Sequence, residues 1–401
     1  MRMNILAIET SCDETAVSIV SANGDFSNAS FHVHGDQLLS QIAIHTKYGG
    51  VYPMLAKREH SKNLIPLFEE VLKEAGMYQC TGPIPSPIPK NPDVEKILER
   101  EPELLEQFLR LFAVLLKPRI DCLAVTEGPG LEPALWVGIN FARALAHTWD
   151  LPLIPVNHVK GHIFSALLEK KEEKEFSLSD VYFPVLALSI AGGHTELVLM
   201  KNWGEYEVVG ETRDDAVGEA FDKVARMLDL PYPGGPEISR LAESAREGKA
   251  LAGTLPEFTL PRPMIDTDDF NFSFSGLKTA VLYRLKKIPE LTNEIKQAVA
   301  LEFENAVTDV LLKKTTRALE HYGARTVVIE GGVSANQNIR RVFKETINAK
   351  FPQVTLRVPE RKLSTDNAIM IAVAGYYRWL TRDKNPLPSQ NSIKANGTLR
   401  L

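Results

Sequence analysis

Two units of strand, polar turn and returning strand stand out in the pattern of hydrophobic and polar positions along the chain. The first joins residues 4–8 to 16–20, and the second joins residues 185–190 to 196–200. Short apolar runs bounded by polar turns are typical of β-hairpins. Because the two units start about 180 residues apart, we interpret them as the openings of two related halves, each with its turn facing a shared cleft.

Further apolar runs and helical periodicities follow each hairpin. Apolar positions that recur every three to four residues indicate helices, and short apolar runs between turns indicate strands. Strands that alternate with helices are typical of the α/β class. We expect strands at 122–126, 153–156, 326–329 and 354–358, and helices at about 57–75, 216–228, 277–285, 294–321 and 366–380, with others ending near 149 and 169. We expect loops at 231–236 and 254–275, and a solvated helix end or linker at 170–175.

Residues 77–119 differ in pattern from the rest of the chain. Five prolines between positions 83 and 92 favour an extended polyproline conformation, and an acidic amphipathic helix follows them. We interpret the segment as a peripheral insertion that packs on its parent domain and is dispensable for folding of the two lobes. The alternative is an arm that docks a partner. The apolar stripe of the helix consists of Leu104, Leu105, Phe108, Leu111, Phe112 and Leu115.

The chain length favours two domains, because 401 residues exceed what one hydrophobic core usually organises. The tail is expected to be extended, since it carries Pro, Ser and Asn. The expected division is a first lobe at 1–157 with the insertion 77–119, a histidine-bearing helix and connector at 158–182, a second lobe at 183–365, a C-terminal helix at 366–382 and a tail at 383–401.

Composition restricts the class of protein. A net charge of −5 argues against a strongly basic nucleic-acid binder, so any RNA binding needs a local patch or the help of a partner. The three cysteines show no C-x-x-C spacing, which makes a disulfide framework improbable. The N-terminus runs directly into a strand pattern, and no apolar run is long enough to span a bilayer. We expect a soluble cytoplasmic protein.

The clearest candidate for chemistry is the histidine pair His158 and His162. On a helix this spacing places both imidazoles on one face, and neutral imidazole is the commonest metal ligand. With Asp366 the pair forms a two-His, one-carboxylate set that suits Fe(II) or Zn(II) and leaves positions open for substrate. Alternatively, the pair is an ordinary surface or core pair and Asp366 is a helix N-cap. Other candidate ligands are His45, His60 and His194.

Glycine pairs follow three apolar strands, at Gly128/Gly130, Gly192/Gly193 and Gly331/Gly332. Glycine lets backbone N–H groups approach a phosphate closely. None of the pairs matches a P-loop or Rossmann spacing, and ordinary turns also require glycine. Three pairs in one chain nevertheless favour two lobes that close on a nucleotide.

An acidic cluster surrounds the start of the helix expected at 216–228. Asp214 and Asp215 are suited to cap that helix, whereas Asp222 lies within it. Asp222 either binds ribose hydroxyls or is an exposed helical carboxylate. The fourth member of the cluster is Glu219.

Together these motifs resemble the tRNA N6-adenosine threonylcarbamoyltransferase family of bacterial type, formerly called O-sialoglycoprotein endopeptidases or glycoproteases. The resemblance covers nearly the whole chain in order, although residues 77–119 have no counterpart in the family core. The matching stretches are 6–15, 157–162, 191–195, 214–223, 232–236, 274–278, 331–336 and 365–367.

The resemblance implies an actin-like ATPase (ASKHA) fold, with two duplicated lobes around a nucleotide cleft. It implies transfer of a threonylcarbamoyl group from threonylcarbamoyl-AMP to N6 of the tRNA adenosine 3′-adjacent to the anticodon. The product is N6-threonylcarbamoyladenosine (t6A) in tRNAs that read ANN codons. AMP is the leaving group.

The resemblance also implies roles for particular residues and partners. His158, His162 and Asp366 would hold one divalent metal, most often iron with zinc as the alternative, and no further catalytic residue is implied. The expected partners are tRNA, a paralogous actin-like subunit, a small P-loop ATPase and a synthase that supplies threonylcarbamoyl-AMP. The residues implied to bind the adenylate are Ser189, Ile190, Ala191, Gly192, Gly193, Asp222, Gly235 and Asn336.

The chain departs from the family pattern at two places. Lys160 stands where the family usually has Glu, and Glu127 stands where it often has a basic or small residue, with Glu132 and Pro133 close behind. The alternative functions are a metalloprotease, a sugar-kinase or acetate-kinase type of ATPase, and a non-catalytic scaffold. A metalloprotease of the His-Glu-x-x-His type needs a general-base Glu that is absent between the two histidines.

Overall fold

The computed structural model describes residues 2–178, 180–248 and 258–401, so residues 254–257 of the expected loop-rich stretch lie outside the described part. The chain divides into two compact units. The first unit consists of Met1–Asp180 together with Asp366–Leu401, and the second consists of Val181–Thr365. The C-terminal helix α12 (Ala368–Leu380) therefore returns to the first unit, where it packs against β1, β2 and α6.

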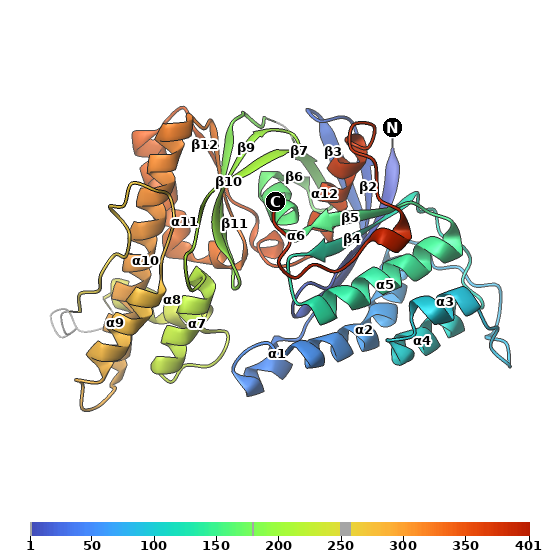
Figure 1. The fold of residues 1–401 in the computed structure, drawn as a ribbon, viewed down its shortest axis with the longest axis horizontal. Helices are drawn as coiled ribbons and strands as arrows, with labels where there is room; N and C mark the ends of the chain where they lie inside the picture. Colours follow the sequence, from blue (N-terminus) through green and yellow to red (C-terminus); the bar gives the residue numbers. More distant parts are fainter. Residues whose placement is uncertain (1, 179, 249–257) are drawn as a thin grey trace. The chain divides into compact units, whose positions relative to one another are not determined.

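The first unit is built on a seven-stranded sheet in the order β5-β4-β1-β2-β3-β7-β6 (Figure 1). β1, β2 and β3 form an antiparallel meander, and β4 and β5 extend the sheet from β1 in parallel register. The strands are β1 Met3–Glu9, β2 Glu14–Asn23, β3 Ala29–Ser40, β4 Cys122–Gly128, β5 Leu153–Asn157, β6 Glu169–Glu172 and β7 Glu175–Leu178.

The second unit has a five-stranded sheet in the order β10-β9-β8-β11-β12. An antiparallel meander is again extended by two parallel strands, so this order repeats the order β3-β2-β1-β4-β5 of the first unit. This repetition confirms the predicted α/β class and the duplicated, actin-like plan. The strands are β8 Val185–Ile190, β9 Thr195–Asn202, β10 Glu205–Glu211, β11 Thr326–Glu330 and β12 Thr355–Arg357.

The helices follow the predicted ones closely, with few exceptions. The expected loop at 231–236 is wrong in its second half, because α8 begins at Gly234. The main helices of the first unit are α2 Pro53–Glu74, α3 Pro92–Ile97, α4 Pro102–Phe112, α5 Glu132–Trp149 and α6 His158–Leu167, after the short α1 Ile42–His45. Those of the second unit are α7 Val217–Met227, α8 Gly234–Arg246, α9 Ser275–Leu285, α10 Asn293–Tyr322 and α11 Gln337–Lys350. No helix in the described ranges has the length and apolar character needed to cross a membrane.

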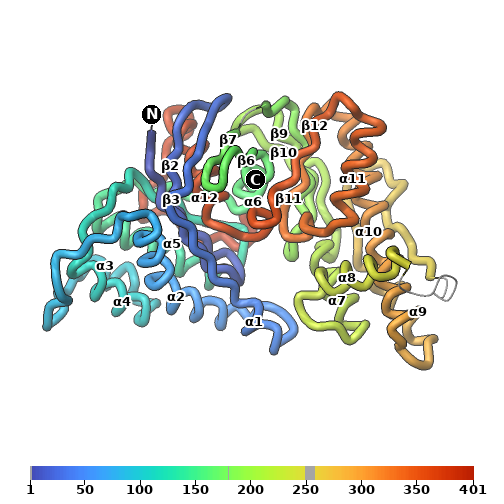
Figure 2. Tube along the Cα trace, turned by 180° about the vertical axis from the view of Figure 1, so that it is seen from behind, coloured from blue at the N-terminus to red at the C-terminus, as the bar shows by residue number. Residues whose placement is uncertain are grey.

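Sequence patterns missed several strands at one end of each sheet. The charged run 170–175 is not a helix end, because β6 and β7 form a hairpin there and β7 pairs with β3 (Figure 2). β3 was not predicted, although its first residues alternate between buried and less buried positions. β10 was also missed. Its side chains are mostly partly exposed, so the apolar alternation that signals a strand is weak there.

The segment 77–119 is part of the core of the first unit rather than a peripheral addition. The rings of Phe108 and Phe112 stack with centroids 3.9 Å apart, and Phe112 lies 5.4 Å from the Trp149 ring. Glu101 is buried, pairs with Lys57 at 3.3 Å and accepts a hydrogen bond from Asn140. The expectation that the segment packs on its parent domain is confirmed, and this burial argues against the expectation that the whole segment is dispensable for folding. Rings of the apolar stripe pack against Phe68 of α2 and against Phe141 and Trp149 of α5, so the stripe is used within the first unit and the docking-arm alternative gains no support.

This packing predicts different outcomes for the two parts of the segment. Phe108→Ala should lower the free energy of unfolding by about 3–5 kcal/mol, because it opens a cavity between α4 and α5. Replacing residues 83–90, which are almost entirely exposed, with a short Gly-Ser linker should change stability little. Urea unfolding followed by circular dichroism measures both, and equal losses would contradict this description of the core.

Candidate functional site

Helix α6 places the two predicted histidines side by side in the first unit. It begins directly after β5, and the Asn157 side chain caps it by accepting a hydrogen bond from the Lys160 N–H at 3.1 Å. The His158 and His162 Nε2 atoms lie 3.2 Å apart, and both residues are buried. The pair is therefore not an exposed surface pair.

Asp366 meets the histidine pair from the segment that precedes α12. Its Oδ1 atom lies 3.0 Å from Nε2 of His162 and 3.4 Å from Nε2 of His158. The cap of α12 is Asn367, which accepts a hydrogen bond from the Met370 N–H, and the helix begins two residues after Asp366. The alternative that Asp366 is only an N-cap is therefore wrong.

These three side chains offer one ligand atom each within 4.8 Å of one another, and they form the single such group found among the described residues. The other candidate histidines are not members of it. Nδ1 of His60 lies 2.7 Å from Thr15 Oγ1, and its Nε2 lies 3.0 Å from the Cys12 carbonyl. His45 pairs with Gln41, and His194 belongs to the second unit.

Glu9 is a member of the site that the sequence did not single out. Its Oε2 atom lies 3.1 Å from Nδ1 of His158 and accepts a hydrogen bond from Thr126 Oγ1 at 2.6 Å. When Nδ1–H donates to this carboxylate, the lone pair of His158 is on Nε2, which faces His162 and Asp366. Such carboxylate–histidine contacts are the usual support of metal-ligating histidines. The only sequence signal was a carboxylate at the end of a buried strand.

The electrostatics of this cluster fit a bound cation. Burial alone would lower the pKa of His158, but Asp366 and Glu9 raise it well above its ordinary value. The pKa of Asp366 is lowered by the two histidines despite burial. Burial and the nearby Asp366 and Asp13 carboxylates raise the pKa of Glu14 to about 10. Two imidazoles and one carboxylate, surrounded by further carboxylates, are a donor set for a divalent transition metal.

The two departures from the family pattern lie close to each other. Burial raises the pKa of Glu127, and the positive charges of Lys160 and Arg378 partly offset that rise. Burial and Arg378 lower the pKa of Lys160, and Glu127 partly offsets that lowering. The two unusual charges therefore compensate one another beside the histidine helix. This compensation helps to accommodate a lysine at a half-buried position.

The turn at Gly128 and Gly130 is explained by packing rather than by phosphate binding. Gly128 has a φ of 147°, and a Cβ there would collide with the Asn396 carbonyl; a Cβ on Gly130 would meet the Ser11 carbonyl. The tail, expected to be extended, crosses this turn: Asn396 N–H donates to the Glu127 carbonyl at 2.8 Å. The prediction of a phosphate site at this turn finds no support in the first unit.

The other two glycine turns lie together at one edge of the second sheet. β8 and β11 are parallel neighbours, so the turns that follow Ile190 and Glu330 leave the sheet at the same edge. A Cβ on Gly192, Gly193 or Gly332 would meet no atom within 4 Å, so these backbones face open space. Gly331 differs, because its φ of 86° and its contact with the Ile190 carbonyl require glycine. Backbone N–H groups at such an edge can receive a phosphate.

The remaining adenylate candidates surround this edge. Ser189 is fully buried, and its hydroxyl has no hydrogen-bond partner in the described structure. Asp222 accepts a hydrogen bond from the Gly234 N–H at 2.7 Å, which fixes the start of α8, while Gly235 faces open space. Asn336 differs, because its amide already caps α11 and donates to Glu304 at 2.5 Å.

Neither Asp214 nor Asp215 caps α7: Asp214 serves α9 instead, and Asp215 contacts lysines of both helices. Asp214 accepts hydrogen bonds from the backbone N–H groups of Phe274 and Ser275 and from the Ser275 hydroxyl, so it anchors the start of α9. Asp215 pairs with Lys223 at 2.8 Å and with Lys278 at 3.2 Å. The expectation that they cap α7 is wrong, since the chain folds the 274–278 motif onto this loop.

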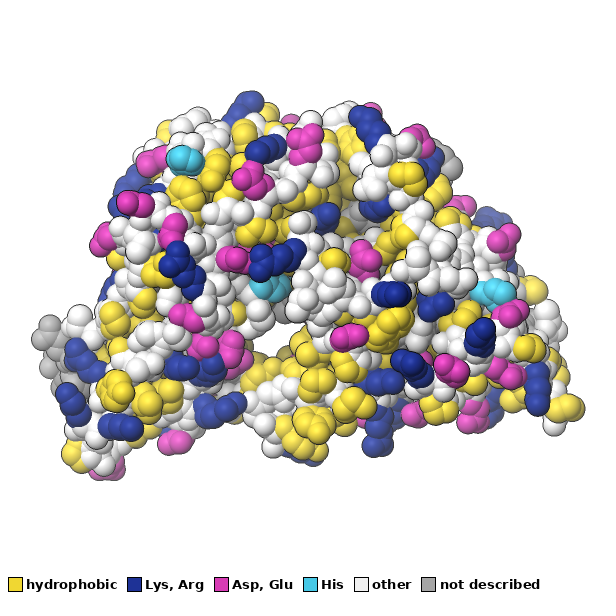
Figure 3. Space-filling view, in the orientation of Figure 1, with side chains coloured by type: hydrophobic (Ala, Val, Ile, Leu, Met, Phe, Trp, Pro, Cys, Tyr) yellow, Lys and Arg dark blue, Asp and Glu magenta, His cyan; other side chains and the backbone are white. Residues whose placement is uncertain are grey.

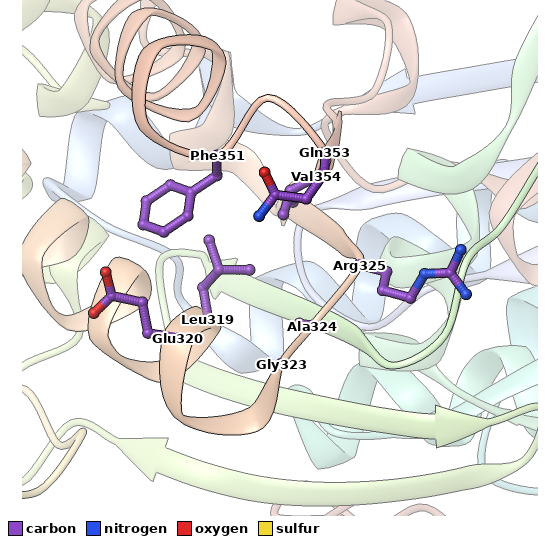
Figure 4. A pocket seen from close by; sticks show the side chains of 8 residues that line it. All are labelled: Leu319, Glu320, Gly323, Ala324, Arg325, Phe351, Gln353 and Val354. Atoms are coloured by element: carbon purple, nitrogen blue, oxygen red, sulfur yellow. The ribbon is translucent and has the colours of Figure 1, made fainter.

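A pocket of about 410 Å³ lies elsewhere in the second unit (Figure 4). Its lining includes Arg325 and Val354, which precede β11 and β12. It therefore opens at the amino ends of these strands, opposite the glycine turns. Ligands of open α/β sheets bind at the carboxyl ends, so this pocket does not belong to the candidate site.

The compensation between Lys160 and Glu127 predicts a reciprocal stability effect. Glu127→Lys and Lys160→Glu should each destabilise the first unit, because each brings like charges together. The double reversal should recover stability, with a coupling of about 0.5–3 kcal/mol. Urea unfolding of the four proteins measures this, and additive losses would show that the two side chains do not interact.

Comparison with known proteins agrees with the geometry. The profile of the family "TsaD: tRNA N6-adenosine threonylcarbamoyltransferase" matches residues 32–80 and 98–373. Residues 98–119 thus have counterparts in the family, and the expectation that all of 77–119 lacks them is wrong. Only residues 81–97 separate the two matched stretches, which agrees with the role of α4 in the core.

Curated relatives carry the same description. The Bacillus subtilis tRNA N6-adenosine threonylcarbamoyltransferase is 39% identical over 93% of this chain and 90% of its own length. The Bacillus anthracis protein of that name is 41% identical over 92% of this chain and 90% of its own length. The Staphylococcus aureus protein is 39% identical over 93% of this chain and 91% of its own length.

Solved structures add little, since full-length HypF in its phosphate- and nucleotide-bound form is 12% identical, with a TM-score of 0.49 over 96% of this chain and 56% of that one. This similarity is too low to support a conclusion about the chain. The family profile and the relatives span most of the chain. The chain therefore belongs to the tRNA N6-adenosine threonylcarbamoyltransferase family of acyltransferases.

Proposed function

We propose that this chain transfers the threonylcarbamoyl group from threonylcarbamoyl-AMP to N6 of the tRNA adenosine 3′-adjacent to the anticodon, with release of AMP. We infer the reaction from membership of the tRNA N6-adenosine threonylcarbamoyltransferase family. The observation that supports its chemistry in this chain is the convergence of His158, His162 and Asp366 on one point in the first unit. In this proposal they hold one divalent metal, iron in preference to zinc.

The residues around the metal ligands have defined tasks. Glu9 fixes the tautomer and ring orientation of His158, and Thr126 orients Glu9. A metal held there supplies Lewis-acid polarisation and orientation of a bound carbonyl group. Ser11 lies 3.2 Å from His158 Nδ1 and 3.4 Å from Asp366 Oδ2, so it connects the two ligands.

The adenylate is assigned to the second unit. The open backbones of Gly192, Gly193 and Gly235 are suited to donate N–H groups to its phosphate, which carries the charge of the leaving group. Ser189, Ile190 and Ala191 belong to the same strand end. Asp222 is the candidate for the ribose hydroxyls. For Asn336 we propose a positioning role, because its side chain is already occupied within the protein.

The proposal includes further proteins. Adenine N6 is a weak nucleophile, so an activated donor and accurate positioning are both required. A synthase must therefore supply threonylcarbamoyl-AMP. We expect a paralogous actin-like subunit and a small P-loop ATPase to assist turnover, and a cytoplasmic location beside the tRNA pool.

A metalloprotease is the weaker alternative. Val159 follows His158 directly, and Lys160 is the next residue, so no glutamate general base lies between the histidines. Glu9 is near His158, but it contacts the Nδ1 side of the ring and shares its oxygen with Thr126. This position suits support of a ligand rather than activation of a water.

The reaction is tested directly with purified protein, tRNA, threonine, bicarbonate and ATP, together with the synthase and partner subunits. We expect t6A in the digested tRNA by mass spectrometry. The His158→Ala/His162→Ala variant should form none and should lose bound metal by elemental analysis. Circular dichroism serves as the fold control. Absence of t6A with the unmodified chain, under conditions where a Bacillus subtilis relative forms it, would refute the proposal.

The support of His158 by Glu9 predicts an effect on metal binding itself. Glu9→Gln keeps the shape but removes the charge that orients His158, so metal affinity should fall about 10- to 100-fold. Competition with a chromophoric chelator measures this without reference to activity. Asp13→Asn is the matched control, since Asp13 is another buried carboxylate of the same turn and contacts neither histidine in the described part of the chain; an equal loss in both variants would indicate a general charge effect.

A further inference from the structure

Helix α9 carries the strongest local concentration of positive charge in an otherwise acidic chain. Residues 276–289 contain four cations and neither Asp nor Glu, whereas the whole chain has a net charge of −5. Figure 3 shows Lys and Arg side chains gathered with hydrophobic ones where α9 lies in Figure 1. We define the α9 patch as the exposed residues Tyr283, Arg284, Lys286 and Lys287.

The opposite face of α9 fixes this patch in place. Leu277 and Val281 are fully buried in the core of the second unit. The start of the helix is anchored by Asp214, and Lys278 is engaged by Asp215. The patch therefore lies at the C-terminal end of a fixed helix. The helix is about 16 Å long, and the loop that carries Asp214 contacts its other end.

The charges of the patch are not neutralised by neighbours in the described residues. The Arg284 guanidinium lies 5.4 Å from the centre of the Phe258 ring, and the Lys286 ammonium lies 5.8 Å from the centre of the Tyr283 ring. Contacts with aromatic faces orient a cation but leave its charge available. No carboxylate of the described ranges forms an ion pair with Arg284, Lys286 or Lys287.

A purely structural role does not explain this arrangement. Cations near a helix C-terminus favour the helix dipole, but one or two in the last turn are enough, and Lys286 and Lys287 follow the last helical residue. The dipole also gives no reason for Tyr283, whose exposed fraction is 62%, or for Leu282 at 37%. An exposed aromatic ring among unpaired cations is the pattern of nucleic-acid contact surfaces.

We propose that the α9 patch binds the tRNA substrate, with its cations on the sugar-phosphate backbone and Tyr283 available to an unpaired base. This inference rests on the proposed function, in which tRNA is the substrate. It assigns tRNA binding to one basic surface of an otherwise acidic protein. A phosphate backbone is the partner that best complements three unpaired cations on one helix end.

The test compares tRNA affinity of two charge-matched variants of the full chain. Lys286→Gln/Lys287→Gln removes two cations from the patch. Lys344→Gln/Lys350→Gln removes two exposed cations from α11 in the same unit. Dissociation constants for unmodified tRNA are measured by filter binding at several salt concentrations. The patch variant should bind several-fold more weakly, with a salt slope reduced by about 0.7–0.9 per lysine that contacts phosphate.

A third variant, Tyr283→Ala, should weaken binding without changing the salt slope, because stacking involves no counterion release. Metal content and adenylate affinity should be unchanged in all three. Equal losses in the two lysine variants, or no measurable tRNA binding by the unmodified chain, would overturn the proposal. Unchanged tRNA affinity combined with lost activity in the presence of partner subunits would assign the patch to an acidic protein instead. Failure of the unmodified chain to form t6A concerns the proposed function, and it leaves the binding measurement interpretable.

Discussion

The buried contact between Glu9 and His158 is the constraint on which the first unit's candidate site depends. A carboxylate buried at the end of a central strand is costly unless its charge is compensated. In this chain the compensation comes from the histidine helix and the Thr126 hydroxyl. Asp366 then meets the same helix from the far end of the sequence. Three segments that are distant in sequence, those of Glu9, His158 and Asp366, are thus held together by buried charges that compensate one another.

Because the topology is duplicated, the candidate residues of both units follow the carboxyl ends of equivalent strands. In each sheet the first strand of the meander has a parallel neighbour, β4 beside β1 and β11 beside β8. Parallel neighbours end at the same edge, so the residues after them converge. The first unit has carboxylates and histidines at that edge, whereas the second has glycine backbones that face open space. In the proposed function, one architecture would therefore serve a cation in the first unit and an anion in the second.

Several features whose place in the fold the sequence did not indicate have clear structural roles. The tail after α12 covers the Gly128 turn, and Ile393 is buried in the core of the first unit. Helix α4 joins the aromatic cluster around Trp149. Lys160 and Glu127 are unusual only when each is considered separately, because their charges offset each other. Each of these features is explained by a neighbour that is distant in sequence.

The sequence by itself determined the α/β class, the two opening hairpins, most helices, and the histidine pair, because these depend on periodicity within a few residues. It also indicated the family, since the motifs follow in order along the chain. Tertiary structure decided that Asn367 and not Asp366 caps α12, that Asp214 anchors α9, and that Glu9 supports His158. It also decided which glycines face open space and which are buried against another segment. The partner of Asp214 lies 60 residues away and that of Glu9 lies 149 residues away. Which side chains meet over such separations depends on how the sheets and helices pack, and local periodicity carries no information about that packing.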